Sequence, residues 1–378
     1  MYIVGYHLFI LLCAVNLVDT SRFPVPRSKK SHIVNVNRHL FNFPSIAVFL
    51  AGQKAAARNG NHALEYSVKL PLYKYDGVFC TEYDIGGVRM QAIVDTGSPF
   101  LVVPSICSTE WGCLTKNEQE MFVDADLEDT TEIFGGQNYA SKWKVGKSIK
   151  LGNIALNGII FSLVGEDAFR PPGGVFMGLI KYKSDDIRPT FLSQTNFSCI
   201  RLNIPERTLE LTSRHLINEA QNAVNLLDLR RDGDPVRHYT ALIKELYING
   251  MRIGKNKQLY AVFDTGTSGC VLQDDLFNDE GTPNPPREIK VVLESNEGND
   301  VVLSASARSR KNIFVVTASD INWFKYERGE CTRRSNNLTC KKVANKNDTP
   351  WVVVLGCAFL EDKIVTIDAD QNKLLLAT

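Results

Sequence analysis

Two acidic turns of nearly the same sequence are the residues of this chain best suited to do chemistry. Asp95 and Asp264 each follow a short apolar run and open the sequences Asp-Thr-Gly-Ser and Asp-Thr-Gly-Thr. The glycine permits a tight turn, and backbone N–H groups and the nearby hydroxyl can donate to the carboxylate. Two carboxylates held close together share one proton, because both cannot ionise easily. Two such groups can do acid–base chemistry, so Asp95 and Asp264 are the candidate reactive residues of the chain.

The two turns belong to an internal repeat. Residues 92–98 (AIVDTGS) recur as residues 261–267 (AVFDTGT), and each copy is followed later by apolar residues ending in glycine, at 176–178 and 354–356. A single Asp-Thr-Gly turn can arise by chance in a β protein. Two copies at matching places favour duplication of one half of the chain.

The segments around these turns read as short strands. β-Branched and aromatic runs alternate with turn residues, which predicts a mainly β protein. The expected strands cover residues 149–151, 159–164, 246–248, 291–293, 301–303, 313–316, 352–355, 364–367 and 373–376. Residues 214–227 have the best amphipathic helix pattern and are predicted to be helical.

Length and charge bound the classes of protein. A chain of 378 residues exceeds the size at which one hydrophobic core stops growing, so two lobes are expected. The net charge of +1 gives no bias toward nucleic acid. The first 63 residues are basic, however, with Asp19 as their acidic residue, so a basic arm precedes a mildly acidic body. The basic residues of the arm are Arg22, Arg27, Lys29, Lys30, Arg38, Lys54 and Arg58.

The N-terminus carries an apolar run at residues 8–18. It is too short to span a bilayer and is typical of the core of a secretory signal peptide. Residues 1–20 are therefore predicted to be a signal peptide, with an uncleaved anchor or a misread start as the alternatives. The mature protein is expected to have no stable membrane insertion.

Nine cysteines leave eight once Cys13 is assigned to the signal peptide. An even number suits an oxidising compartment. Cys107 and Cys113 can close one small disulfide loop, and Cys331 and Cys340 another. Four further cysteines lie in apolar runs, where buried thiols and disulfides are equally good interpretations: Cys80, Cys199, Cys270 and Cys357.

Other site patterns add less. Asn196, Asn337 and Asn347 begin glycosylation acceptor triplets. The chain has no paired CxxC motifs and no histidines at metal-ligand spacing, so no metal is expected.

With these motifs in hand, residues 64–378 resemble the pepsin-like aspartic proteases. The shared motifs are the two Asp-Thr-Gly turns, Val103-Pro-Ser with the following cysteine loop, Leu355-Gly and the segment 367–374. The resemblance implies a bilobal fold, with an N-terminal catalytic lobe at 64–200, a C-terminal catalytic lobe at 201–378 and the active-site cleft between them.

The resemblance also implies an activity. Such a chain is an aspartic endopeptidase that activates water between Asp95 and Asp264, needs no cofactor, cleaves peptides or proteins and works as a monomer. Residues 21–63 match a basic propeptide that inhibits the enzyme until it is released, which makes the chain a secreted zymogen of the extracellular space or of an acidic vesicle or vacuole. The residues that support the pair are Thr96, Gly97, Ser98, Thr265, Gly266 and Thr267, and the two threonines are expected to tie the turns together.

The chain departs from the family pattern in four places. One is the Asp-Gly that precedes the first apolar-Gly strand in family members, which here is Gly173-Gly174-Val175. Family members carry a tryptophan where this chain has Val102, and a tyrosine in a β-hairpin flap. Alignment of residues 133–136 with the flap assigns Phe134, Gly135 and Gly136 to it, with Tyr139 as an alternative for the tyrosine. Cys357 stands where acid-active members often have an aspartate. The loss of that charge predicts a pH optimum that is acidic but milder than gastric, or has no effect on pH.

Two other functions remain open. A pepsin-like binding protein or inhibitor that has lost activity would account for the altered flap and Val102. Glycoside hydrolysis also uses two carboxylates, but it explains neither the paired glycine turns nor the basic arm.

Overall fold

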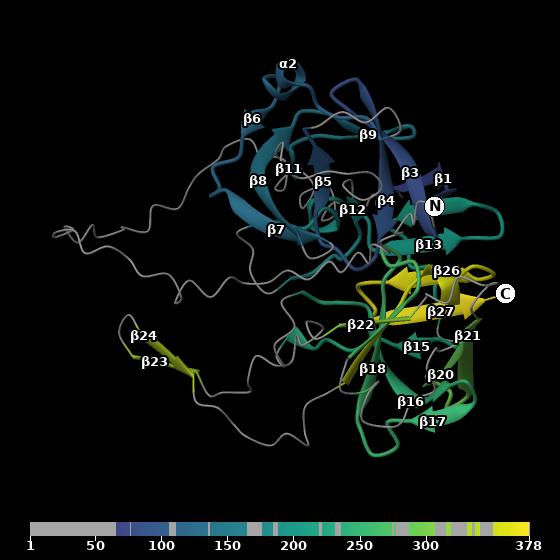
Figure 1. The fold of residues 1–378 in the computed structure, drawn as a ribbon. Coiled ribbons are helices and arrows are strands. Elements are labelled where there is room, and N and C mark those ends of the chain that lie inside the picture. The colour runs from purple at the N-terminus through teal and green to yellow at the C-terminus, as the bar shows by residue number, and fades with distance from the viewer. Residues whose placement is uncertain are drawn as a thin grey trace, which may run out of the picture. The chain divides into compact units, whose positions relative to one another are not determined.

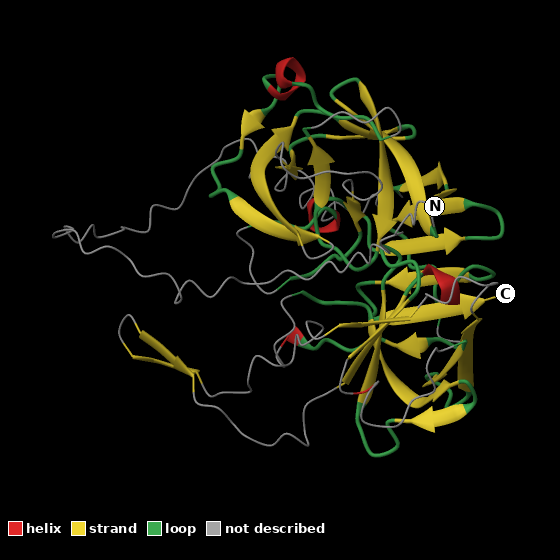
Figure 2. Cartoon of the chain, in the orientation of Figure 1, coloured by secondary structure: helices red, strands yellow, loops and turns green. Residues whose placement is uncertain are grey.

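The computed structural model describes residues 66–75, 77–105, 111–134, 137–164, 176–183, 188–218, 221–230, 236–273, 276, 287–306, 315–318, 331–334, 337–340 and 351–377. These residues belong to one compact unit. Strands dominate them, and the helices are short (Figure 2). The mainly β class is thus confirmed, and so are the positions of the predicted strands, apart from residues 313 and 314, which lie outside the described residues. The segments predicted as signal peptide and propeptide lie outside the described residues, and so do Asn347 and Cys107.

The largest sheet of the described chain has 11 strands and contains the Asp95 turn. Figure 1 shows it curling into a half-barrel. Its main path runs β10-β9-β3-β4-β12-β5-β11-β8-β6, with β2 beside β3 and β7 beside β8. The strands are β2 (Tyr73–Tyr75), β3 (Val78–Ile85), β4 (Val88–Asp95), β5 (Leu101–Pro104), β6 (Val123–Asp124), β7 (Thr130–Phe134), β8 (Gln137–Gly146), β9 (Ile149–Leu151), β10 (Ile154–Leu156), β11 (Ile159–Val164) and β12 (Phe176–Gly178).

The Asp264 turn belongs to an eight-stranded sheet of order β21-β20-β16-β18-β25-β19-β22, with β17 beside β16. Its strands are β16 (Thr240–Ile248), β17 (Met251–Ile253), β18 (Leu259–Phe263), β19 (Cys270–Gln273), β20 (Glu288–Glu294), β21 (Asp300–Ser306), β22 (Val315–Ala318) and β25 (Trp351–Leu355).

These two sheets repeat one five-strand motif. In the first sheet the order is β3-β4-β12-β5-β11, and in the second it is β16-β18-β25-β19-β22. The successive pairings are antiparallel, parallel, antiparallel and parallel in both. The strand before each aspartate, β4 or β18, lies beside the apolar strand that precedes the later glycine. The internal sequence repeat therefore corresponds to a structural repeat.

A six-stranded sheet of order β1-β14-β13-β26-β27-β15 joins strands from both ends of the described chain. Its strands are β1 (Ser67–Pro71), β13 (Cys199–Asn203), β14 (Thr208–Thr212), β15 (Val224–Asn225), β26 (Ile364–Asp368) and β27 (Lys373–Ala377). The predicted boundary between residues 200 and 201 falls inside β13. The remaining described elements are the hairpin β23 (Cys331–Arg334) and β24 (Asn337–Cys340), the helix α2 (Lys116–Gln119) and the 3-10 turns η2 (Leu192–Gln194) and η6 (Cys357–Phe359).

The helix predicted at residues 214–227 is wrong. The described residues of this segment contain no helix, and its end forms β15. Val224 pairs with Leu374, and the N–H of Leu226 donates to the carbonyl of Asn372 at 2.8 Å. The end of the segment is held by this pairing with the last strand, so tertiary contacts override the local pattern.

Candidate functional site

The first acidic turn closes β4. Ala92, Ile93 and Val94 are buried and carry the chain into Asp95, which has 0% exposure. The carboxylate is nevertheless hydrogen-bonded, because Oδ1 accepts the backbone N–H of Gly97 at 2.8 Å and Oδ2 accepts the hydroxyl of Ser98 at 2.6 Å. The predicted roles of the turn glycine and of the hydroxyl three residues after the aspartate thus match the observed contacts.

The second acidic turn repeats this arrangement after β18. Asp264 is 6% exposed. Its Oδ1 accepts the backbone N–H of Gly266 at 2.8 Å, and its Oδ2 accepts the hydroxyl of Thr267 at 2.8 Å. In both turns Oδ1 accepts the glycine N–H and Oδ2 accepts the hydroxyl. The structural repeat therefore includes the hydrogen bonds of the two carboxylates.

Thr96 and Thr265 tie the two turns together, as predicted. The backbone N–H of Thr96 donates to Oγ1 of Thr265 at 3.1 Å, and the N–H of Thr265 donates to Oγ1 of Thr96 at 3.0 Å. Each hydroxyl then donates across to the opposite strand, Thr96 to the carbonyl of Phe263 at 2.8 Å and Thr265 to that of Val94 at 2.5 Å. These four buried hydrogen bonds fix both the spacing and the orientation of the turns.

The turns bring the two carboxylates side by side. A Cβ atom built on Gly97 would lie 2.5 Å from Oδ1 of Asp264, and one built on Gly266 would lie 2.6 Å from Oδ1 of Asp95. Each carboxylate therefore packs against the glycine of the other turn. Burial raises the pKa of Asp264 well above its ordinary value, and the charge of Asp95 and a hydrogen bond with it raise that pKa further. A proton is thus held by the pair at pH values where an exposed aspartate would have lost it.

Cys357 lies directly behind the second turn. Its Sγ atom donates to the carbonyl of Thr265 at 3.1 Å, and its side chain is fully buried. Burial raises the pKa of this thiol, and the neighbouring Asp264 raises it further. The thiol is therefore uncharged beside the carboxylates. Of the four cysteines whose state the sequence left open, all are buried free thiols: Cys80, Cys199, Cys270 and Cys357.

The predicted flap corresponds to a β-hairpin. Strands β7 and β8 pair in antiparallel register up to Phe134 and Gln137. Between these two residues stand Gly135 and Gly136, which lie outside the described residues. The alternative flap residue, Tyr139, is on β8 opposite Glu132. Val102, which replaces the tryptophan of the family pattern, is buried in β5.

The predicted disulfides and acceptor asparagines are described in part. Cys113 is disulfide-bonded. Cys331 and Cys340 stand directly opposite each other in the register of β23 and β24. Asn196 is exposed, as an acceptor site requires, and Asn337 begins β24.

Within the described residues, no group of three or more His, Cys, Asp or Glu side chains is placed to hold a metal ion. No helix in the same part of the chain is long and apolar enough to cross a membrane. One cavity of about 270 Å³ lies against Leu72, Phe79 and Ile204, beside the ion pair that Lys74 forms with Glu361 at 2.6 Å. None of the residues lining it belongs to the two acidic turns.

Comparison with models of known protein families finds no match, and comparison with curated protein sequences finds none either. The assignment of function therefore depends on the geometry of the paired turns and on the residue types within them.

Thr265→Val is expected to destabilise the fold strongly. Valine keeps the volume of the side chain but leaves the buried carbonyl of Val94 without its donor and the N–H of Thr96 without its acceptor. An unsatisfied buried polar group costs about 1–3 kcal/mol, so the free energy of unfolding should fall by about 2–5 kcal/mol. Urea denaturation measures this loss. Thr81→Val is the matched control, because that buried hydroxyl makes one hydrogen bond, to the carbonyl of Pro71 at 2.8 Å. Equal stability of the two variants would contradict the double role of Thr265.

Proposed function

We propose that the chain is an aspartic endopeptidase with a pepsin-like bilobal fold, in which Asp95 and Asp264 activate water for peptide-bond hydrolysis. The observation that carries this proposal is the contact between two buried, identically hydrogen-bonded carboxylates supplied by the two copies of one structural motif. Two such groups packed together retain one proton, which is the state that general acid–base hydrolysis by a carboxylate pair requires.

The reaction follows from that shared proton. A water molecule between the carboxylates gives a proton to the ionised member, and its oxygen forms a bond to the carbonyl carbon of the substrate. The protonated member gives its proton to the carbonyl oxygen, so the intermediate is tetrahedral and no covalent bond to the enzyme forms. The C–N bond then breaks, and the amine leaves with the proton taken from the water. One hydroxyl of the intermediate returns its proton to the aspartates, so the acyl product is a carboxylic acid and the pair again holds one proton. Neither aspartate has a fixed role, because the proton belongs to the pair.

The turns supply what this chemistry needs from the protein. The N–H groups of Gly97 and Gly266 and the hydroxyls of Ser98 and Thr267 each donate to a carboxylate oxygen. These donors hold the oxygens in position before the substrate arrives, so little reorganisation is needed during the reaction. The hairpin of β7 and β8 is the proposed flap, with Phe134 at its end.

The same proposal extends to maturation and location. Residues 1–20 act as a secretory signal peptide, and the basic residues 21–63 act as an inhibitory propeptide. The enzyme works as a monomer on peptides or proteins, outside the cell or in an acidic vesicle or vacuole. The disulfide at Cys113 and the exposed Asn196 suit an oxidising secretory route.

The test is cleavage of an unfolded protein substrate at acidic pH by the activated chain. Cleavage should be blocked by a pepstatin-type inhibitor and lost in Asp264→Ala. Because Cys357 is an uncharged neighbour of Asp264, the pH–rate profile should peak at acidic pH but above about pH 3. A peak below that value would contradict this part of the proposal.

The test also separates the alternatives. A folded chain that binds the inhibitor but cleaves nothing would be the inactive binding protein suggested by the altered flap. Glycoside hydrolysis also uses two carboxylates, but it is disfavoured because it does not explain why each carboxylate packs against the glycine of the other turn.

A further inference from the structure

A second route of hydrogen bonds connects the two acidic turns, and it passes through Tyr239. The backbone N–H of Leu179, just after β12, donates to the carbonyl of Asp95 at 2.7 Å. The carbonyl of Leu179 in turn accepts the phenolic hydroxyl of Tyr239 at 2.6 Å. Tyr239 immediately precedes β16, the neighbour of the strand that leads to Asp264.

The route closes into a ring on the other side. The carbonyl of Tyr239 accepts the backbone N–H of Phe263 at 3.0 Å, and Phe263 directly precedes Asp264. The carbonyl of Phe263 accepts the hydroxyl of Thr96 at 2.8 Å, and Thr96 directly follows Asp95. Tyr239 is therefore the side chain through which the segment behind Asp95 is fastened to the strand before Asp264, independently of the bonds that Thr265 makes.

The surroundings of Tyr239 keep its hydroxyl a hydrogen-bond donor. The side chain is 3% exposed. Burial raises the pKa of the phenol above its ordinary value, and the charged or titratable side chains near it are Tyr182, Arg237 and Asp370. A hydrogen bond from the backbone of Lys181 acts in the opposite direction on this pKa but is outweighed by burial. The protonated hydroxyl therefore donates to the carbonyl of Leu179 at 2.6 Å, which fixes the distance between the tyrosine ring and that carbonyl.

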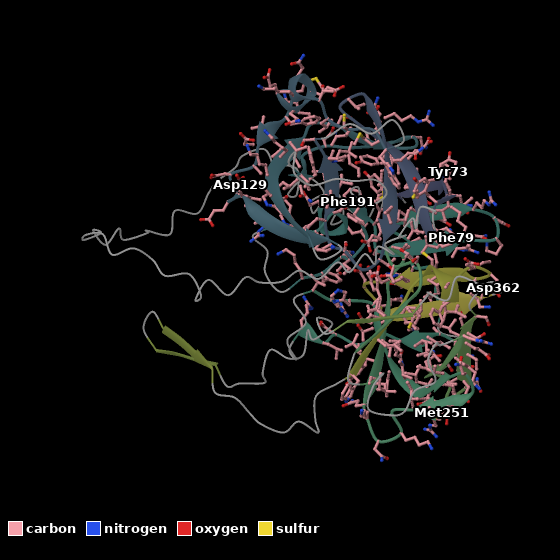
Figure 3. The ribbon with its side chains drawn as sticks, in the orientation of Figure 1. Tyr73, Phe79, Asp129, Phe191, Met251 and Asp362 are labelled. Carbon is pink, nitrogen blue, oxygen red and sulfur yellow. The ribbon has the colours of Figure 1, made fainter. Side chains whose placement is uncertain are left out.

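The first copy of the structural repeat has no tyrosine at the position that Tyr239 occupies in the second copy. Cys80 pairs with Ile93, two residues before Asp95, and Thr240 pairs with Val262, two residues before Asp264. The residues just before Cys80 and Thr240, Phe79 and Tyr239, therefore occupy equivalent places. Phe79, labelled in Figure 3, is equally buried but has no hydroxyl. The hydroxyl is thus a feature of one half of the repeat, and the phenylalanine of the other half shows that the fold accepts a plain phenyl ring there.

We propose that Tyr239 is a positioning residue that sets the spacing of Asp95 and Asp264 by fastening the segment behind one turn to the strand behind the other. The inference rests on the proposed endopeptidase function, which it deepens. A tighter spacing strengthens the interaction of the two carboxylates, so the first proton of the pair leaves at lower pH and the second at higher pH. The singly protonated, active pair then persists over a wider pH range.

Tyr239→Phe removes the hydroxyl and keeps the ring, so it tests the spacing directly. We expect kcat to fall roughly fivefold, as the loss of one buried hydrogen bond implies, with KM unchanged. We also expect the bell-shaped pH profile of kcat to become narrower, its acidic limb moving up and its basic limb moving down. The groups that border the pair, Cys357 included, are unchanged in this variant. Circular dichroism and thermal unfolding establish that the variant is folded.

Tyr83→Phe is the matched control, because the hydroxyl of Tyr83 is also buried and has no hydrogen-bond partner in the described part of the chain. It should leave kcat and the width of the profile unchanged. A Tyr239→Phe enzyme with the kcat and the profile width of the unmodified chain would overturn the proposal.

A second measurement separates this proposal from the proposed function. Carbon-13 NMR titration of the aspartate carboxyls reports the separation between the two apparent pKa values of the pair without any turnover. That separation should shrink in Tyr239→Phe and stay constant in Tyr83→Phe. If the unmodified chain cleaves no peptide but this shrinkage is seen, the endopeptidase assignment fails and the positioning role stands. If cleavage depends on Asp264 and the separation is the same in all three proteins, the positioning role fails alone.

Discussion

Asp264→Asn is expected to abolish peptide hydrolysis and, at neutral pH, to make the fold more stable than that of the unmodified chain. Hydrolysis should fall by at least about 10³-fold, because asparagine cannot take part in proton transfer. The gain in stability follows from the raised pKa of Asp264, which results first from burial and then from Asp95. The aspartate binds its proton more tightly in the folded state than in the unfolded state. Its contribution to stability is therefore complete below the unfolded pKa, near about 4, and is lost as pH rises through the folded pKa.

Asparagine is neutral at every pH, so the Asp264→Asn variant does not lose stability when the pH rises through the folded pKa of Asp264. Urea denaturation from pH 3 to pH 8 should show the two proteins diverging as pH rises, by about 1.4 kcal/mol for each unit by which folding raises the pKa. Asp362→Asn is the control, because the pKa of Asp362 is shifted in the opposite direction to that of Asp264. Asp362 is exposed (Figure 3), and its pKa is lowered chiefly by a hydrogen bond from Lys363. That substitution should give no stabilisation at neutral pH. An Asp264→Asn variant that is less stable than the unmodified chain at pH 8 would show that burial of the ionised Asp264 carboxylate does not destabilise the fold.

Gly97→Ala should greatly lower the rate of peptide hydrolysis, although it substitutes neither Asp95 nor Asp264. The added methyl carbon would lie 2.5 Å from Oδ1 and 2.8 Å from Oδ2 of Asp264, inside van der Waals contact. The carboxylate of Asp264 must shift, which disturbs its placement relative to Asp95, its partner in the shared proton. A displacement of about 1 Å in a catalytic group can cost on the order of a hundredfold in rate, so kcat should fall by at least that factor.

The structural repeat supplies a second test of the same idea. Gly266→Ala directs its methyl group at Asp95, with Oδ1 at 2.6 Å, and should cause a loss of similar size. Gly146→Ala is the control, because a Cβ there would meet side-chain carbons of Ile149 at 3.2 and 3.3 Å. Steady-state kinetics of the three variants distinguish the predictions. Activity in Gly97→Ala equal to that of Gly146→Ala would mean that the two carboxylates do not need their close contact.

The sequence predicted those parts of the site that depend on the type of a side chain. A strand leading to an aspartate, a turn glycine and a hydroxyl three residues on each leave a local signature. The repetition of that signature indicated a duplication, and the family resemblance predicted that the two turns act together. The cross-bonding of Thr96 and Thr265 came from the family resemblance, and the structure adds their acceptors, the carbonyls of Val94 and Phe263.

Hydrogen bonds between a side chain and a distant backbone group were not predictable in this way. Tyr239 was missed because its partner is the carbonyl of Leu179, an atom that every residue possesses. Its one signal was its place in the repeat, where Phe79 is its equivalent. The helix expected at residues 214–227 failed for a related reason. Its apolar periodicity was compatible with burial on a helix, and only the pairing of Val224 with the distant Leu374 decided otherwise.

The six-stranded sheet has a consequence for how this duplicated chain can be divided. β1, β13 and β14 come before the second motif, whereas β26 and β27 come after it, and β13 pairs with β26 along five residues from Cys199 to Asn203. A polypeptide cut between the two copies would leave each fragment with an open row of backbone donors and acceptors at this seam. Although the sequence contains two tandem copies of one motif, neither copy supplies all the strands of this sheet, so a chain of half the length would need a second copy of itself to cover the exposed edge.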